Sequence, residues 1–175
     1  ADFYFIHNRV QLPQDPKLRW FQYRIIHRIL GTKKFLFKIR KSDDPLCTFC
    51  RNSNETLLHL FAVCPIVEIF RNEIWQWIQT CSRINYTPTK SEMILGGLFE
   101  KFTETINVVL ISINYFIYCA KYKGNQLSFI AFKKYLQFQF NIDRFIFIKN
   151  MNPEKLNVKW SFLCEIFESE ELNMQ

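Results

Sequence analysis

The sequence predicts an all-α fold, and three observations lead to that prediction. Glycine is scarce, with four residues in a chain of 175. Apolar residues recur at intervals of three and four positions rather than in alternation, which is typical of helices. Hydrophobic residues make up 49% of the chain and aromatic residues 17%, so there is enough apolar material for a folded core. The length suits one domain, or a compact domain with a smaller appendage.

The first helix is expected over residues 17–30, where the chain reads KLRWFQYRIIHRIL. A basic ridge along one face of this helix would consist of Lys17, Arg24 and Arg28. The neighbouring stripe, which should face the core, consists of Leu18, Phe21, Ile25 and Ile29. Gly31 is expected to end this helix, and Thr32 to cap a second helix over residues 33–41.

Helices are also expected in the rest of the chain. The apolar side of a helix over residues 66–81 consists of Ile66, Ile69, Phe70, Ile74, Trp77 and Ile78. Residues 82–97 read as a linker, because Pro88 and the Gly96–Gly97 pair interrupt the helical pattern. Two long helices should follow over residues 100–122 and 127–148, and a last helix after Pro153.

The positive charge of the chain is concentrated in its first third. The net charge is +7, and residues 1–51 hold 11 Lys or Arg and 4 Asp or Glu, whereas residues 52–175 hold 12 of each. Such asymmetry predicts an anionic partner at that end of the chain, nucleic acid before membrane. The alternative is a solvated basic face without a ligand.

No membrane partner is expected. The longest uncharged run, residues 105–120, has 16 residues and contains polar side chains, so it is too short and too polar to span a bilayer and reads as a buried helix. No signal peptide is visible, and the ends of the sequence suggest a piece of a longer protein. Cysteine usage fits a reducing compartment, the nucleus or cytoplasm.

A cluster of cysteine and histidine predicts a zinc site. Its spacing is Cys47-x2-Cys50-x8-His59-x4-Cys64, and zinc takes four such ligands in a tetrahedron. Asn52 and Glu55 fit a capping box that would start a short helix carrying His59. Because positions five apart lie about 140° apart around a helix, the helix must loosen before Cys64, and Pro65 is well placed to force this.

The alternative interpretation is four residues that fall together by chance in an apolar core, where free cysteine is common. A redox CxxC pair would need a βαβ pattern, which the sequence lacks. The other cysteines are Cys81, Cys119 and Cys164, which stand singly among apolar residues and read as core. Four potential ligands within 18 residues favour zinc.

The residues around the cluster resemble the region downstream of the polymerase in LINE-type (non-LTR) retrotransposon reverse transcriptases. Positions that match the zinc-binding segment of that family are Cys47, Cys50, Glu55-Thr56, His59-Leu60-Phe61 and Cys64-Pro65. The resemblance extends from about Leu18 to Trp160 and is strongest over residues 18–78. The sequence departs from it at Ala62-Val63, where Trp-Glu is more usual, and at Cys119-Ala120-Lys121, where an Arg is common.

The resemblance implies three segments and a partner within the same polyprotein. The segments are a basic helical segment following the polymerase (1–42), a zinc-binding reverse-transcriptase-associated domain (43–82) and a helical tail (83–175). The zinc would be structural, since four protein ligands leave no open position. The fragment itself is expected to be non-catalytic, because it has no Tyr-x-Asp-Asp box, and the Asp43-Asp44 pair reads as part of a turn.

The family's role in copying RNA at a nicked target implies that this portion holds template RNA or target DNA. The candidate phosphate-binding residues are Lys17, Arg24, Arg28, Lys33, Lys34, Lys38, Arg40, Lys41 and Arg51. The aromatic residues interleaved with them, which could stack on bases, are Trp20, Tyr23, Phe35 and Phe37, although Trp20 and Phe21 are expected in the core. The rival interpretation is a zinc-pinned protein-interaction module that docks on the polymerase or a host factor.

Overall fold

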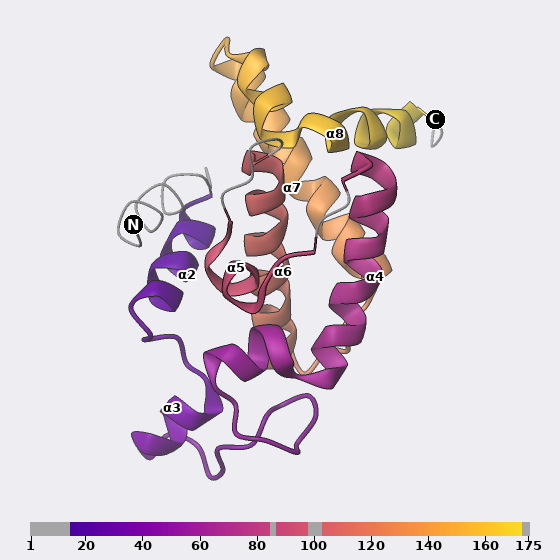
Figure 1. The fold of residues 1–175 in the computed structure, drawn as a ribbon. Helices are drawn as coiled ribbons and strands as arrows, with labels where there is room; N and C mark the ends of the chain where they lie inside the picture. The colour runs from indigo at the N-terminus through magenta and orange to yellow at the C-terminus, as the bar shows by residue number, and fades with distance from the viewer. Residues whose placement is uncertain (1–14, 85–86, 98–102, 173–175) are drawn as a thin grey trace.

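The structure is a computed structural model that describes residues 15–84, 87–97 and 103–172 (Figure 1). Its elements are α2 (Pro16–Ile26), α3 (Lys33–Lys38), the π-helical turn η1 (His59–Val63), α4 (Pro65–Ser82), α5 (Lys90–Leu95), α6 (Thr103–Lys123), α7 (Phe129–Lys149) and α8 (Pro153–Leu172). Within the described ranges there is no strand, and an isolated β-bridge joins Leu46 to Asn54. The all-α prediction is confirmed.

Helix α6 is the centre of the core. It contacts α2, α5, α7 and α8, and Figure 1 shows it in the middle of the bundle. Its side chains from Thr105 to Asn114 are all buried, as expected of a helix that is apolar on every side. The uncharged run 105–120 is therefore a core helix. None of the described helices is long and apolar enough to cross a membrane.

The first two helices end earlier than the sequence predicts. Helix α2 ends at Ile26, before Gly31, and Arg28 adopts a left-handed φ of 55°, which breaks the predicted ridge. Leu18, Phe21 and Ile25 are buried as expected, but Ile29 is 45% exposed because the chain has already left the helix. Thr32 does cap α3: its Oγ1 accepts from the Phe35 N–H at 3.3 Å.

Helix α4 buries Phe70, Ile74 and Ile78 as predicted, but its buried face is shifted around the helix from the predicted one. Ile66 and Ile69 are 46% and 61% exposed, whereas the buried residues are Val67, Phe70, Arg71, Ile74, Trp75 and Ile78. The helix has apolar residues at adjacent positions, so its apolar pattern is compatible with more than one buried face. The observed phase also buries Arg71, whose Nη2 donates to Asn114 Oδ1 on α6 at 2.5 Å.

The predicted linker contains a helix, and the predicted last helix is bent. Thr89 and Glu92 form a capping box at the start of α5, which contacts η1 and α6. Helix α8 is interrupted at Ser161 (φ 16°), whose hydroxyl lies 2.7 Å from that of Thr105 on α6. The division at residues 42 and 82 stays a prediction, and the main hydrophobic cluster draws on all three segments.

Candidate metal centre

The loop that carries Cys47 and Cys50 is closed by its own backbone. The Cys47 N–H donates to Ser53 O at 2.8 Å, and the Arg51 N–H donates to Cys47 O at 3.0 Å. Arg51 has a φ of 58°, so the chain reverses immediately after the second cysteine. The closed loop holds both sulfurs on its inner side, where backbone N–H groups of Phe49 and Cys50 point at Cys47.

His59 and Cys64 are brought together by the π-helical turn between them. The Cys64 N–H donates to His59 O at 2.8 Å, a bond between residues five apart, which widens the turn to about 4.4 residues. Cys64 itself is extended (φ −61°, ψ 124°), as a residue before proline prefers. The expectation that the helix loosens before Cys64 is confirmed.

The predicted start of this short helix is wrong. Residues 51–53 form bends, and the helical residues begin at Leu57. Thr56 is the cap, since its Oγ1 accepts from the His59 N–H at 3.0 Å. Asn52 and Glu55 form no capping box because the Glu55 carboxylate is engaged elsewhere.

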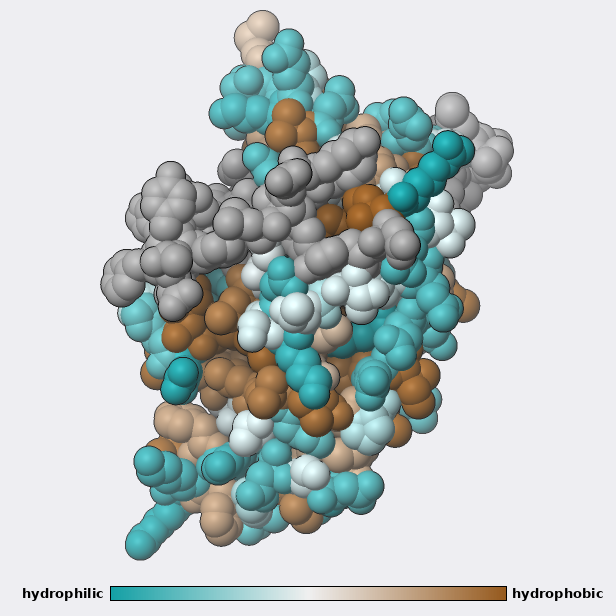
Figure 2. Space-filling view, in the orientation of Figure 1, coloured by the Kyte–Doolittle hydropathy of each residue, from teal (hydrophilic) through white to brown (hydrophobic). Residues whose placement is uncertain are grey.

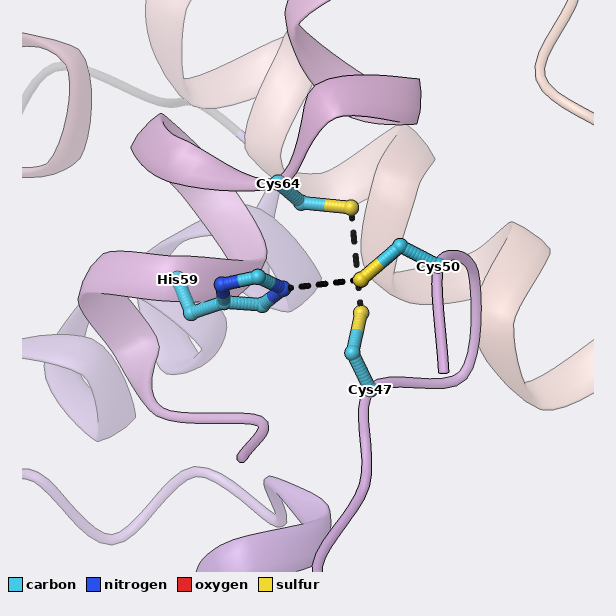
Figure 3. Close-up of side chains that lie close together, drawn as sticks. All are labelled: Cys47, Cys50, His59 and Cys64. Carbon is cyan, nitrogen blue, oxygen red and sulfur yellow. Dashed lines mark hydrogen bonds between the residues drawn. The ribbon is translucent and has the colours of Figure 1, made fainter. Parts of the chain in front are cut away.

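The four predicted ligands converge on one point (Figure 3). Their donor atoms all lie within 4.8 Å of one another; Cys47 Sγ and Cys64 Sγ are 3.8 Å apart, and Cys50 Sγ and His59 Nε2 are 3.3 Å apart. A zinc tetrahedron with bonds of about 2.3 Å to sulfur and 2.0 Å to nitrogen has edges of about 3.8 and 3.5 Å. The observed separations fit that tetrahedron, so the residues can hold a zinc ion.

The surroundings of two of the sulfurs act on their ionisation in opposite directions. Burial raises the pKa of the Cys47 thiol to about 12, and its side chain is fully buried. Burial also raises the pKa of the Cys50 thiol, but hydrogen bonds from the Asn52 N–H and the neighbouring sulfurs outweigh it, so the pKa falls below its usual value. A divalent cation held here would supply positive charge that favours thiolate ligands.

Glu55 ties the loop to the helix before it, a role that the sequence reasoning missed. Its carboxylate is fully buried. Oε1 accepts from the Lys33 N–H at the start of α3 at 2.8 Å, and Oε2 accepts from the N–H and Oγ1 of Thr48, at 2.8 and 2.7 Å. Thr48 lies between the two cysteines, in the loop of residues 47–53 that we call the metal loop. Glu55 therefore joins α3 to the metal loop.

Lys121 on α6 completes this buried polar centre. Its Nζ lies 2.6 Å from Glu55 Oε1 and donates to Gly31 O at 2.6 Å, which also accepts from Tyr122 Oη at 2.9 Å. Although burial acts against it, hydrogen bonding from Lys121 and Thr48 holds the pKa of Glu55 below its usual value. The sequence signal was available: Lys121 ends the uncharged run of a buried helix, where a charge needs a partner.

The predicted phosphate-binding residues separate into two groups. Lys33 and Arg51 lie 3.6 and 3.4 Å from the Asp44 carboxylate, and Arg24 Nη2 donates to Tyr118 Oη at 3.1 Å. The other six are exposed: Lys17, Arg28, Lys34, Lys38, Arg40 and Lys41. Arg51 is exposed as well, in spite of its ion pair with Asp44. Asp44 also accepts from the Leu46 N–H at 2.8 Å, in agreement with its predicted place in a turn.

The aromatic residues near these cations differ from expectation in one case. Phe21 is buried as predicted, but Trp20 is 59% exposed, so the core position expected for it is wrong. Position 20 lies on the outer side of α2, opposite Leu18 and Ile25. Tyr23 and Phe37 are also exposed, and Phe35 is half-buried.

Comparison with known proteins agrees with the site. Residues 5–75 match the family model described as zinc-binding in reverse transcriptase. No curated protein and no solved structure matches the chain. The matched range contains all four predicted ligands. Over residues 5–75 the chain is therefore similar to the zinc-binding family of reverse transcriptases, and its ligand geometry agrees with that similarity.

Proposed function

We propose that the chain is the non-catalytic, zinc-binding C-terminal portion of a LINE-type (non-LTR) retrotransposon reverse transcriptase. In this proposal it holds template RNA or target DNA during target-primed reverse transcription, beside the polymerase domain of the same polyprotein, in the nucleus or cytoplasm. The observation that carries the proposal is the placement of exposed cations directly beside the metal loop.

The metal would act by fixing the shape of this surface. The zinc would be held by Cys47, Cys50, His59 and Cys64, and it would cross-link the loop to η1. Such binding contributes on the order of 10 kcal/mol to the free energy of local folding. The Glu55 carboxylate then fixes α3 against the same loop through the Lys33 N–H. The position of α3 therefore depends on the metal loop.

The cations on α3 and the turn after it form the α3 cationic surface, defined as Lys34, Lys38, Arg40 and Lys41. All four are exposed, and Figure 2 shows hydrophilic side chains over α3 at the lower left, mixed with apolar ones. Such a surface neutralises phosphates without reading sequence. Single-strand affinity should then fall with salt, with a logarithmic slope of about 0.7 for each phosphate contact.

The metal is tested by native mass spectrometry of the purified, reduced chain. We expect one zinc per chain, lost in Cys50→Ser and kept in the matched variant Cys119→Ser, whose cysteine lies outside the cluster. Wild-type chain without zinc, or zinc that survives Cys50→Ser, would contradict the site.

Nucleic-acid binding is tested with a random single-stranded oligonucleotide at increasing salt. The variant Lys34/Lys38/Arg40/Lys41→Glu should lose binding and flatten the salt slope. The control variant Lys90/Lys123/Lys134/Lys149→Glu carries the same change in charge at exposed positions elsewhere. If both variants weaken binding equally, net charge rather than the α3 cationic surface governs it.

One observation favours the second candidate, a protein-docking module. The outer face of α7 carries an exposed apolar stripe of Ile130, Phe138, Ile142, Phe145 and Ile148, which fall within about 120° around the helix. A stripe of this kind is typical of a protein interface. Exposed Lys134 and Lys149 accompany it, and the single acidic residue of α7, Asp143, is buried against Lys159.

The chemistry of the stripe selects its occupant. A second copy would bring like charges together, so the stripe fits an amphipathic helix with acidic flanks. The docking candidate is tested by co-purification with the polymerase domain of the same polyprotein. Loss of that association in Phe138→Glu/Phe145→Glu, but not in the α3 charge-reversal variant, would support it; association that both variants keep would contradict it.

A further inference from the structure

We infer that α2 carries a stacking site for unpaired nucleobases, formed by the side chains of Trp20, Tyr23 and His27. The inference rests on the nucleic-acid binding proposed above and adds the class of ligand: single-stranded RNA or DNA with accessible bases. These residues lie at positions i, i+3 and i+7, which form one row along a helix.

Two of the three rings form a stack, and the third is tilted against it. The Trp20 and Tyr23 rings are parallel within 9°, with centroids 5.2 Å apart. The His27 ring is inclined by 42° to Tyr23, with centroids 4.1 Å apart. Because the rings order one another before any ligand binds, less side-chain entropy is lost on binding. A base placed on the outer face of Trp20 would continue the stack.

The row is open to solvent on the side of α2 that faces away from the core. Trp20 is 59% exposed and Tyr23 38%, whereas the same helix buries Phe21 against Tyr115 and Tyr118. The indole face of Trp20 is therefore accessible to a ligand.

Cations lie close to the row on the same side of α2. Lys17 and Arg24 lie on the face of α2 beside Trp20, within about 60° of it. Arg24 is held in place by its hydrogen bond to Tyr118 Oη and lies over the Tyr118 ring, 5.7 Å from its centroid. Arg28 follows His27 at the end of the row and is exposed.

This arrangement selects single strands. Aromatic stacking needs a base whose face is open, which a duplex does not offer, and it tolerates any base. RNA and single-stranded DNA share this chemistry.

The test measures Trp20→Ala in the 175-residue chain, with Phe145→Ala as the matched control. Phe145 is an aromatic side chain on α7 that is 68% exposed. Alanine is favourable in both helices. Probes are oligo(U), oligo(dT), an abasic oligonucleotide of equal length and a duplex. We expect Trp20→Ala to bind oligo(U) or oligo(dT) about 5- to 150-fold more weakly, with duplex and abasic binding unchanged.

Tryptophan fluorescence gives a second readout that needs no variant. Trp75 and Trp160 are buried and Trp77 is half-buried, so quenching by oligo(U) or oligo(dT) would report on Trp20. The tighter of the two probes identifies the RNA or DNA source. An unchanged salt slope in Trp20→Ala would show that phosphate contacts persist.

The outcomes separate this inference from the proposed function. Wild-type affinity in Trp20→Ala, or equal losses on single-stranded, duplex and abasic probes, would overturn the stacking site while the salt dependence still supports nucleic-acid binding. No quenching on binding would also overturn it. If no probe binds even at low salt, the proposed function fails and the stacking site fails with it.

Discussion

Replacing Lys121 by methionine should destabilise the protein strongly, although Lys121 is remote in sequence from the metal ligands. The change keeps most of the side-chain volume and removes the ammonium group. Glu55 then loses the cation 2.6 Å from its Oε1. Its carboxylate stays buried, with only the Lys33 N–H and the two Thr48 groups to solvate it.

The expected loss is about 3–5 kcal/mol of unfolding free energy, the range measured when one partner of a buried ion pair is removed. Gly31 O contributes little to this loss, because it keeps its hydrogen bond from Tyr122 Oη. The double variant Glu55→Gln/Lys121→Met should be milder than the sum of the two single changes by about 2 kcal/mol. That difference measures the coupling of the metal loop to α6.

The assay is urea unfolding of zinc-loaded protein at neutral pH, followed by far-ultraviolet circular dichroism. The control is Lys123→Met on the same helix, where the side chain is exposed and the expected change is below about 0.5 kcal/mol. If Lys121→Met is as mild as Lys123→Met, or if the single changes add, the ion pair does not couple the two parts and the reasoning fails.

Three further measurements follow from the site. Zinc binding should release protons, because burial raises the pKa of Cys47 to about 12 and its thiol is protonated at neutral pH without metal; affinity should therefore rise with pH, and calorimetry in buffers of different ionisation enthalpy would detect the release. Cys50→Ser should unfold residues 45–65, seen as faster amide hydrogen exchange there, with α7 and α8 unchanged. Asp44→Asn should strengthen oligonucleotide binding and steepen its salt slope, because it releases Lys33 and Arg51 from their ion pairs; unchanged affinity would mean that these two residues lie outside the binding surface.

The four candidate metal ligands, which the structure brings together, could be predicted from sequence because the constraint on their spacing is local. Cys47, Cys50, His59 and Cys64 lie within 18 residues, and Pro65 indicates where the helix must change its geometry. The same reasoning placed the helix start wrongly, since Asn52 and Glu55 match a capping box in spacing. The carboxylate of Glu55 binds groups 22 and 66 positions away along the chain, Lys33 and Lys121, and spacing carries no information about such partners.

For the basic residues, too, the sequence identified the residue types but not their distant partners. The sequence identified the cations, but it could not show that Arg24 is held by Tyr118 or that Asp44 binds Lys33 and Arg51. The helical period placed Leu18, Phe21 and Ile25 in the core correctly. It failed at Ile29, because α2 ends early. The core position expected for Trp20 did not follow from the period, which puts position 20 opposite Leu18 and Ile25; it followed from the aromatic side chain, which suits a core and an exposed stack equally.

The all-α class, the four candidate metal ligands and the concentration of positive charge in the first third of the chain could be predicted without the fold. These features depend on composition, helical period and short spacings, which act between residues near one another in the chain. The buried face of α4, the set of cations that remain exposed and the way in which Glu55 and Lys121 join the metal loop to α6 became visible in the folded structure. Those outcomes depend on contacts between distant segments, whose energies are fixed only when the segments meet in the folded core.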